Sequence, residues 1–376
     1  MKKNCPCKKI LIATIIIAAI TAIIAVVLYS PTEAKEFTES RDQGEYLNAI
    51  ELGGEWFLNN QNEDFLHYKY YPYEDRYDEN SHALREMGAL WSITQLEKFL
   101  NDKRYKELAQ KGFAYFENYL EENSINDFYY INISPQKIKL GYNAFAILSL
   151  IEIDHPKKDD LLKGLANGIL HLQKDNGELR TFFFSTRTTG KDYYPGEALL
   201  SLMALYEYNG DPQYLEAVQK AFPFYVGYFK MNPNTAFIPW QSRAYYKLFK
   251  ATGDTEVRDF IFKMNDFILD EYNPKGNCSD FDFTPGIVAA VHSEGVNMAY
   301  DLAREMNDLE RSKCYKNFSK ETSDYILTLQ ITDEESFKPA AIGGFLGYPE
   351  SDSQQVDRNQ HAALSLIDAY NFGILK

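Results

Sequence analysis

Cysteine is scarce in this sequence, with four residues in a chain of 376. Cys5 and Cys7 lie close to the N-terminus, where they are either free thiols or acylation sites beside a membrane. Cys278 and Cys314 can pair in an oxidising compartment, but two cysteines do not make a disulfide framework. No cysteine–histidine cluster has zinc spacing, and no dense carboxylate loop indicates calcium. The sequence therefore predicts neither a metal nor a cofactor.

Basic residues are also in short supply. The chain has 39 Lys and Arg against 54 Asp and Glu, which gives a net charge of −15 at pH 7. An acidic domain repels phosphate backbones, and no basic stripe along the sequence offsets this repulsion. Nucleic acid is therefore excluded as a partner, although individual arginines can still bind an acidic sugar.

Charge is absent altogether from the run of twenty residues between Ile10 and Tyr29. A helix of this length spans the ~30 Å hydrocarbon core of a bilayer, and the lysines before it favour a cytoplasmic N-terminus. A cleaved signal peptide is the alternative, but the run is long for one and residues 30–34 form a poor cleavage site. We expect a single-pass membrane protein with an uncleaved anchor. Its expected parts are a cytoplasmic tail (1–9), a transmembrane signal anchor (10–29), a linker (30–42) and one extracytoplasmic domain (43–376).

One type of turn recurs along that domain, at intervals of roughly 45–55 residues, which is typical of a repeat architecture. In each copy, Asn or Gly ends a helix and Asp follows, where an N-cap would accept a backbone hydrogen bond. The four copies lie at residues 100–105, 209–214, 252–255 and 307–310, with Asp102, Asp211, Asp254 and Asp308 as the expected caps. Residues 155–159 fill the gap between the first two.

Each turn joins two different helical patterns. The segment before it is apolar nearly all round, which predicts a buried inner helix: 84–99, 144–153, 198–208, 244–251 and 288–306. The segment after it is amphipathic, which predicts an outer helix: 105–120, 161–172, 214–229, 255–272 and 311–329. Residues 361–372 form an inner helix without an outer partner, and residues 46–58 an outer helix without an inner one. These two can pair across a closure, so we expect a ring. Gln61, Gln173 and Gln330, which end outer helices, are expected to clamp adjacent repeats.

With this repeat, the chain resembles the (α/α)₆ toroid superfamily, the six-hairpin glycosidases and their relatives. It is most similar to the C-terminal domain of D-glucuronyl C5-epimerases and to bacterial proteins that modify polysaccharides. The resemblance covers residues 43–376 and rests on the repeat pattern. It implies an all-α toroid that binds a polysaccharide or oligosaccharide.

In such a ring, the starts of the inner helices surround one mouth, and the long polar and aromatic loops before them are typical of a functional site. Glu197 follows Tyr193, Tyr194 and a Pro-Gly turn at one of these starts. It is either a general acid or base, or a carboxylate that complements the helix dipole.

The last inner helix begins with a polar set in which Asp357, Arg358 and His361 stand out. Asp357 is either an N-cap or a second catalytic carboxylate. Arg358 is expected to hold a sugar carboxylate with its guanidinium fork.

Two further helix starts supply candidates for substrate binding. His82 and Arg85 lie one turn apart before the first inner helix, and Trp240 precedes Arg243 at the fourth. An aromatic residue at a cleft rim stacks on sugar rings, whereas the alternative for Trp240 is a core residue. His292, inside the fifth inner helix, is interpreted as a core histidine.

We expect an enzyme that acts on an envelope or extracellular polysaccharide by hydrolysis, β-elimination or C5-epimerisation. Hydrolysis requires two carboxylates, for which Glu197 and Asp357 are the candidates. Elimination or epimerisation requires a base and an arginine, for which Tyr194, His361 and Arg358 are the candidates. The alternative is a glycan-binding or assembly protein without catalysis. An isoprenoid-processing toroid is disfavoured, because no Asp-x-Asp-Asp motif occurs.

Overall fold

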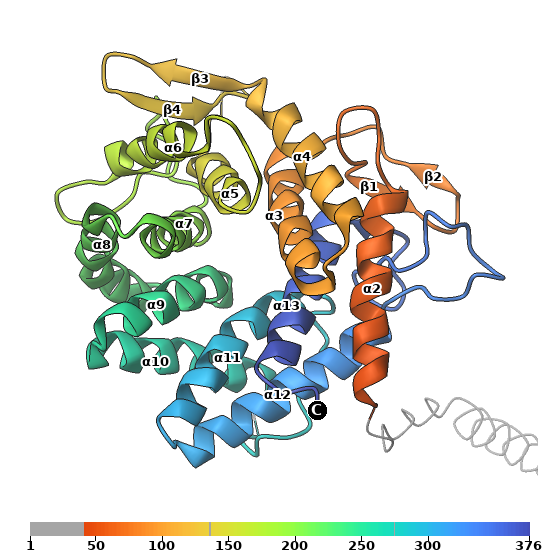
Figure 1. Cartoon of the computed structure of the whole chain (residues 1–376). Helices are drawn as coiled ribbons and strands as arrows, with labels where there is room; N and C mark the ends of the chain where they lie inside the picture. The colour runs from red at the N-terminus through yellow and green to blue at the C-terminus, as the bar shows by residue number, and fades with distance from the viewer. Residues whose placement is uncertain (1–40, 135–136, 274) are drawn as a thin grey trace, which may run out of the picture. The chain divides into compact units, whose positions relative to one another are not determined.

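The twelve α-helices that the structure describes form an inner and an outer ring (Figure 1). This computed structural model describes residues 41–134, 137–273 and 275–376, and Asp42–Lys376 form one unit. The inner helices are α3 (Ala83–Leu100), α5 (Leu140–Leu150), α7 (Tyr194–Asn209), α9 (Ile238–Thr252), α11 (Val288–Glu305) and α13 (Val356–Asn371). The outer helices are α2 (Gln43–Asn59), α4 (Lys103–Glu117), α6 (Lys158–Leu172), α8 (Pro212–Met231), α10 (Thr255–Tyr272) and α12 (Leu309–Leu327).

The inner ring closes between its first and last helices. Each inner helix packs against the next one in the chain, and α13 packs against α3. Each outer helix lies on the inner helix that precedes it, except α2, which has none before it and packs on α13. The expected pairing of the two leftover helices is therefore confirmed.

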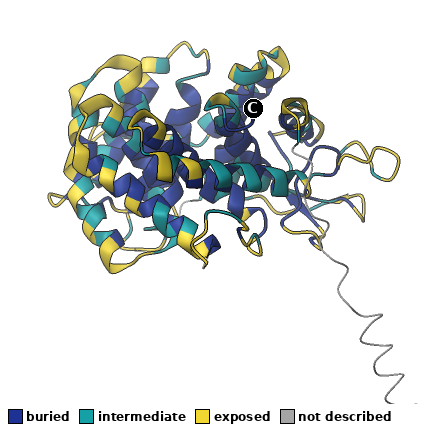
Figure 2. Cartoon of the chain, turned by 90° about the horizontal axis from the view of Figure 1, so that it is seen from below, coloured by how far each residue is buried: buried dark blue, intermediate teal, exposed yellow. Residues whose placement is uncertain are grey.

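Burial follows the two sequence patterns. Every residue of α5 is buried, whereas α4 buries one face through Tyr105, Leu108 and Phe113 and exposes the other. Figure 2 shows the same division, with the inner helices largely buried and exposed residues gathered on the outer ones. A helix without a polar face is stable only when neighbours cover it on all sides, which is the position of the inner ring.

The repeated turns form as predicted. Asp102, Asp211, Asp254 and Asp308 each cap the following outer helix by accepting a backbone N–H bond, at distances of 2.9, 3.0, 2.9 and 3.1 Å. Before these caps, the chain turns through left-handed backbone at Asn101, Gly210, Gly253 and Asn307. Asn and Gly tolerate that conformation best, which explains why these two residue types mark the repeat.

Two of the three expected glutamine clamps join neighbouring outer helices. Gln173 Nε2 donates to the Ala217 carbonyl of α8 at 2.8 Å, and Gln330 Nε2 donates to the Ala49 carbonyl of α2 at 2.9 Å. The prediction is wrong for Gln61, which donates to the Leu58 carbonyl of its own helix. Because the Gln330 bond spans the closure, it fastens the last outer helix to the first.

Short strands, which were not among the expected elements, form in the loops. Strands β1 (Lys69–Tyr71), β2 (Arg76–Tyr77) and β5 (Gln354–Gln355) form an antiparallel sheet in the order β2-β1-β5. Strands β3 (Leu120–Asn123) and β4 (Phe128–Ile131) form a hairpin, and η1 (Thr235–Phe237) is a 3₁₀ turn before α9. The first sheet joins the loop before α3 to the loop before α13, so it also lies at the closure.

No helix within residues 41–134, 137–273 and 275–376 is both long and apolar enough to cross a bilayer. The expected anchor at residues 10–29, with the tail before it and most of the linker after it, lies outside the described residues.

Cys278 and Cys314 form a disulfide between the loop after α10 and helix α12. Their Cα atoms are 4.8 Å apart, and they are separated by 36 positions in the sequence. The bridge therefore ties down the loop that leads into α11.

Reduction of this disulfide should lower the free energy of unfolding by about 3–4 kcal/mol, because a closed loop of 36 positions restricts the unfolded chain. Urea unfolding with and without dithiothreitol measures the change. The Cys278→Ser/Cys314→Ser variant is the control and should unfold identically under both conditions. Equal unfolding midpoints for the unmodified chain in the two buffers would contradict the prediction.

Candidate active site

A cavity of about 500 Å³ lies at the end of the inner ring where the six inner helices begin. Eight of the ten predicted site residues line it: His82, Arg85, Tyr193, Tyr194, Glu197, Trp240, Asp357 and His361. Arg243 and Arg358 are not among its lining residues. Since helix N-termini carry partial positive charge, this end of the ring favours an anionic or polar ligand.

Glu197 is a buried carboxyl group in the first turn of α7, with 4% of its surface exposed. Its Oε2 atom has no hydrogen-bond partner among the described residues. Burial raises the pKa of Glu197 to about 8, although the charge of Lys139 acts in the opposite direction. The carboxyl group therefore holds its proton at neutral pH and is suited to donate it.

The space for this carboxyl group depends on a glycine of the neighbouring helix. A Cβ atom at Gly141, in the first turn of α5, would lie 2.3 Å from Glu197 Oε2. Trp240 approaches from the other side, because a Cβ atom at Gly196 would lie 2.6 Å from the Trp240 Cβ atom. Close contact between α5, α7 and α9 therefore fixes the position of Glu197.

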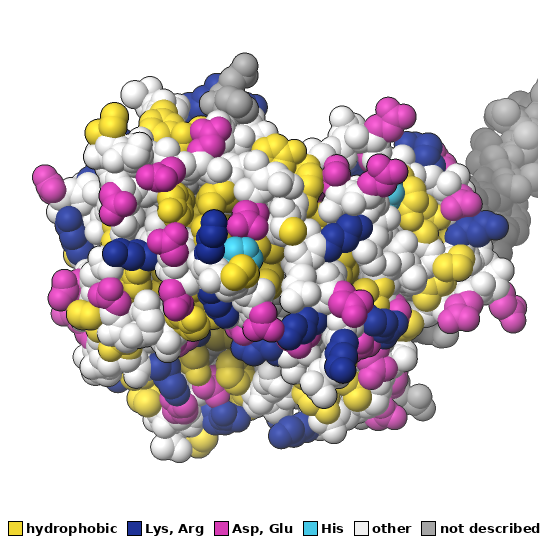
Figure 3. Space-filling view, turned by 45° about the horizontal axis from the view of Figure 1, so that its top comes forward, with side chains coloured by type: hydrophobic (Ala, Val, Ile, Leu, Met, Phe, Trp, Pro, Cys, Tyr) yellow, Lys and Arg dark blue, Asp and Glu magenta, His cyan; other side chains and the backbone are white. Residues whose placement is uncertain are grey.

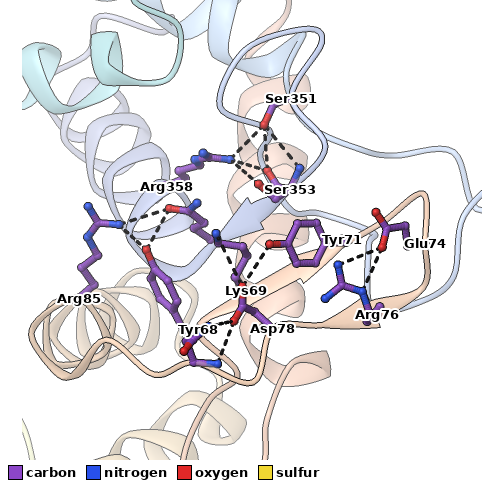
Figure 4. Close-up of polar contacts among 12 residues, drawn as sticks. Tyr68, Lys69, Tyr71, Glu74, Arg76, Asp78, Arg85, Ser351, Ser353 and Arg358 are labelled. Carbon is purple, nitrogen blue, oxygen red and sulfur yellow. Dashed lines mark hydrogen bonds and ion pairs between the residues drawn. The ribbon is translucent and has the colours of Figure 1, made fainter.

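Asp357 is the second residue of α13, and the N-cap of that helix is Gln355. The N-cap interpretation of Asp357 is therefore wrong. Its Oδ2 atom lies 3.4 Å from Arg85 Nε, whereas its buried Oδ1 atom has no partner among the described residues. Arg85 also donates to the hydroxyl of Tyr68, as Figure 4 shows. The cavity thus contains an ion-paired carboxylate in addition to the protonated Glu197.

His361 begins a chain of charged groups that runs along the inside of the ring. Its Nδ1 atom lies 2.6 Å from Glu294 Oε1, and Glu294 Oε2 accepts from Arg243 Nε at 2.9 Å. Arg243 also donates to Asp368, and burial raises the pKa of that carboxyl group to about 6 even beside the guanidinium. Arg243 therefore contacts the buried Glu294 and the half-buried Asp368, and the structure does not place it with the predicted substrate-binding residues.

His292 also lines the cavity, although only 5% of its surface is exposed. Its Nδ1 atom lies 2.8 Å from the Tyr272 hydroxyl. Burial, with a smaller contribution from His361, lowers the pKa of His292 to about 4. The interpretation as a buried histidine matches this environment, although the residue also lines the cavity. With its pKa lowered to about 4, the ring is a neutral imidazole at physiological pH.

Arg358 points away from the position predicted for it. Its guanidinium donates to Ser351 Oγ at 3.2 Å and to the Ser353 carbonyl (Figure 4). A Cβ atom at Gly347 would lie 2.8 Å from its Cζ atom, so the loop backbone packs against the guanidinium. The side chain therefore holds the loop before α13 and does not line the cavity.

Three residues of the site were missed at the sequence level or not assigned to it: Lys139, Gln360 and Glu294. Lys139 and Gln360 line the cavity, whereas Glu294 is not among the lining residues but contacts His361, which is. Lys139 and Gln360 lie in or next to segments predicted to form the mouth, but no local motif distinguishes them from their polar neighbours. No group of three or more His, Cys, Asp or Glu in the described parts of the chain is placed to hold a metal ion.

Comparison with known proteins identifies the architecture through structure alone. No family model matches the sequence, and no curated protein matches it. The α-1,6-mannanase of Salegentibacter sp. HEL1_6 superposes with a TM-score of 0.65 at 11% identity, covering 88% of this chain and 100% of the mannanase. The cellobiose 2-epimerase of Bacillus thermoamylovorans B4167 gives 0.63 at 14% identity, covering 86% and 98%. The unsaturated glucuronyl hydrolase of Streptococcus agalactiae gives 0.57 at 13% identity, covering 90% and 97%.

The fold is an (α/α)₆ toroid. The expected resemblance to the six-hairpin glycosidases is confirmed at the level of the fold. Identities this low show the toroid alone, and the chemistry of the cavity depends on its own residues.

Glu197 provides a test of the cavity's electrostatics that needs no substrate. In the unfolded chain its pKa is the ordinary 4.5, and in the folded chain it is about 8. Between these values the unfolded state releases the proton and the folded state keeps it, so the free energy of unfolding falls as pH rises. Glu197→Gln removes this loss, and its stability relative to the unmodified chain should rise by roughly 1 kcal/mol per pH unit across that window.

Urea unfolding of both proteins from about pH 5 to about pH 8 measures this difference. Glu51→Gln, at an exposed position of α2, is the matched control because it leaves the cavity unchanged. A difference that shrinks with rising pH would show that Glu197 is stabilised as a carboxylate and would contradict the prediction.

Proposed function

We propose that this protein is a carbohydrate-active enzyme that hydrolyses a glycosidic bond of a polysaccharide or oligosaccharide in the toroid cavity. In this proposal Glu197 donates a proton to the leaving oxygen and Asp357 is the second carboxylate. The observation that carries the proposal is that two carboxyl groups in different environments line one cavity. Glu197 is held in its protonated form by burial, whereas Asp357 is ion-paired with Arg85. Glycoside hydrolysis needs one carboxylic acid and one carboxylate at the scissile bond.

The walls of the cavity are suited to a sugar. Trp240 and Phe145 contribute aromatic surface, with ring centroids 5.5 Å apart, and Tyr193 at the rim is 46% exposed. Aromatic faces stack on the apolar face of a sugar ring while nearby polar groups bind its hydroxyls. The solved toroids reported above are, by their names, a mannanase, a sugar epimerase and a glucuronyl hydrolase, which supports a sugar ligand.

We further propose that the toroid is held outside the cytoplasm by the apolar segment at residues 10–29. The lysines before this segment favour a cytoplasmic N-terminus. The Cys278–Cys314 disulfide supports the same location, because such bonds persist in oxidising compartments. The substrate would then be a polysaccharide of the cell envelope or its surroundings.

Glu197→Gln and Asp357→Asn should each lower turnover at least 100-fold without unfolding the protein, because each removes a group that transfers a proton or stabilises charge in the reaction. The test uses the fragment from Lys35 to Lys376 with a panel of neutral and uronic-acid polysaccharides in D₂O. New reducing ends, unsaturated sugars and deuterium incorporation are followed together.

Asp352→Asn, at an exposed position in the loop before α13, is the control for Asp357→Asn and should retain full turnover. Unsaturated products would identify a lyase instead of a hydrolase. Binding without any turnover across the panel would favour a glycan-binding protein. Full activity of both cavity variants on a true substrate would disprove the assigned roles.

A second function, sugar epimerisation, is favoured by the two histidines of the cavity. Glu294 contacts His361 at Nδ1 and Tyr272 contacts His292 at Nδ1, so Nε2 of each ring is the nitrogen without a hydrogen bond in the described chain. One neutral imidazole can take the proton from a sugar carbon next to a carbonyl group, and the other imidazole, in its protonated form, can deliver a proton to the opposite face of the same carbon. This arrangement replaces the predicted set, because Arg358 does not line the cavity.

If the protein is an epimerase, deuterium should enter the sugar without cleavage, and His361→Asn should abolish the exchange. Glu294→Gln should reduce it by a smaller factor, because that change alters the orientation and charge of the imidazole but keeps the ring itself. NMR of the sugar in D₂O follows the reaction. His155→Asn, on the loop before α6, is the matched control. Exchange that persists in His361→Asn would rule out this role.

A further inference from the structure

Lys139 brings a positive charge into the cavity from the start of α5. It occupies the N-cap position of that helix and is held by a backbone bridge to Phe182. The side chain is half-buried and lines the cavity, with Nζ 5.4 Å from the centroid of the Tyr142 ring. No carboxylate of the described chain forms an ion pair with it. An ammonium group in this position loses hydration without gaining a counter-ion.

The other ionisable groups of the cavity leave this charge uncompensated. Arg85 on α3 is paired with Asp357 on α13. The charge of Glu197 on α7 would act on Lys139, but the raised pKa of Glu197, about 8, keeps its carboxyl group protonated at neutral pH. Burial lowers the pKa of both His82 on α3 and His292 on α11, so neither adds charge. His361 on α13 contacts the carboxylate of Glu294, which is shared with Arg243.

Among the Lys and Arg side chains that line the cavity, Lys139 is therefore the one without a carboxylate ion pair in the described chain, at the end of the ring where six helix N-termini also converge. It contrasts with the rest of the chain, whose net charge is −15. On the face shown in Figure 3, Lys and Arg side chains are interspersed with Asp and Glu and form no broad basic surface. The positive charge is local to the site.

We infer that Lys139, with Arg85 beside it, binds a carboxylate on the substrate, and that the protein acts on a uronic-acid glycan. The inference rests on the proposed function and specifies the substrate class of the same cavity. One unpaired ammonium matches a carboxylate, which carries one negative charge at neutral pH, better than a phosphate ester, which carries more. Lys139 thereby takes the role that the sequence suggested for Arg358, whose guanidinium is bound to Ser351 and Ser353.

The test is a binding experiment on the full-length chain in non-ionic detergent. It uses trisaccharides of galacturonate, mannuronate and glucuronate, together with the neutral trisaccharides made from each by carboxyl reduction. All proteins carry Glu197→Gln, which prevents turnover and, at neutral pH, preserves the charge of the protonated side chain. Isothermal titration calorimetry at neutral pH measures each dissociation constant.

At least one uronate trisaccharide should bind roughly 10- to 100-fold tighter than its neutral counterpart, the range expected for a charge-assisted hydrogen bond. Lys139→Met should abolish this preference and Lys139→Arg should restore most of it. Lys137→Met, at an exposed lysine two positions earlier, is the matched control and should leave the preference unchanged.

Three outcomes would overturn the inference. Neutral trisaccharides that bind as tightly as the uronates would disprove the substrate class while leaving the proposed function intact. A preference for uronates that survives Lys139→Met would disprove the role of Lys139. Failure of every trisaccharide to bind would contradict both the inference and the proposed glycan-binding cavity.

Discussion

The contact between α13 and α3 is the interaction on which the rest of the toroid depends. It joins the last inner helix to the first, and the packing of α2 on α13 covers the joint from outside. The Gln330–Ala49 hydrogen bond and the sheet of β1, β2 and β5 fasten the same region. Because inner and outer helices alternate in direction, closure brings six inner-helix N-termini to one end. The cavity and its polar lining follow from that geometry, and the helix dipoles at this end favour anions.

Much of the architecture could be predicted from the sequence because its signals are local. A helix that lacks a polar face must be buried, and a turn of Asn or Gly followed by Asp specifies a helix end and the next helix start. Asp102, Asp211, Asp254 and Asp308 are caps for this reason. The pairing of β1 with β5 escaped prediction because it joins segments far apart in the chain, such as Lys69 and Gln355.

The candidate site was predictable as a set of positions but not as a set of contacts. The predicted residues lie at or near the starts of the inner helices, which border the cavity, and eight of the ten line it. Arg243 differs because its guanidinium meets Glu294 and Asp368. Arg358 and Asp357 are adjacent in sequence but point to different neighbours, a distinction that only tertiary packing determines.

The position of α13 also has a consequence for how the protein is made. α13 is the last of the six inner helices in the chain, and it supplies Asp357, Gln360 and His361 to the cavity. Until it emerges during synthesis, the ring is an open arc whose two end helices, α3 and α11, present uncovered apolar surface. Exposed apolar surface of this kind favours aggregation, so the chain is most exposed to that risk before the final helix completes the ring. Biosynthesis thus produces the binding cavity and a fully buried core in one late step.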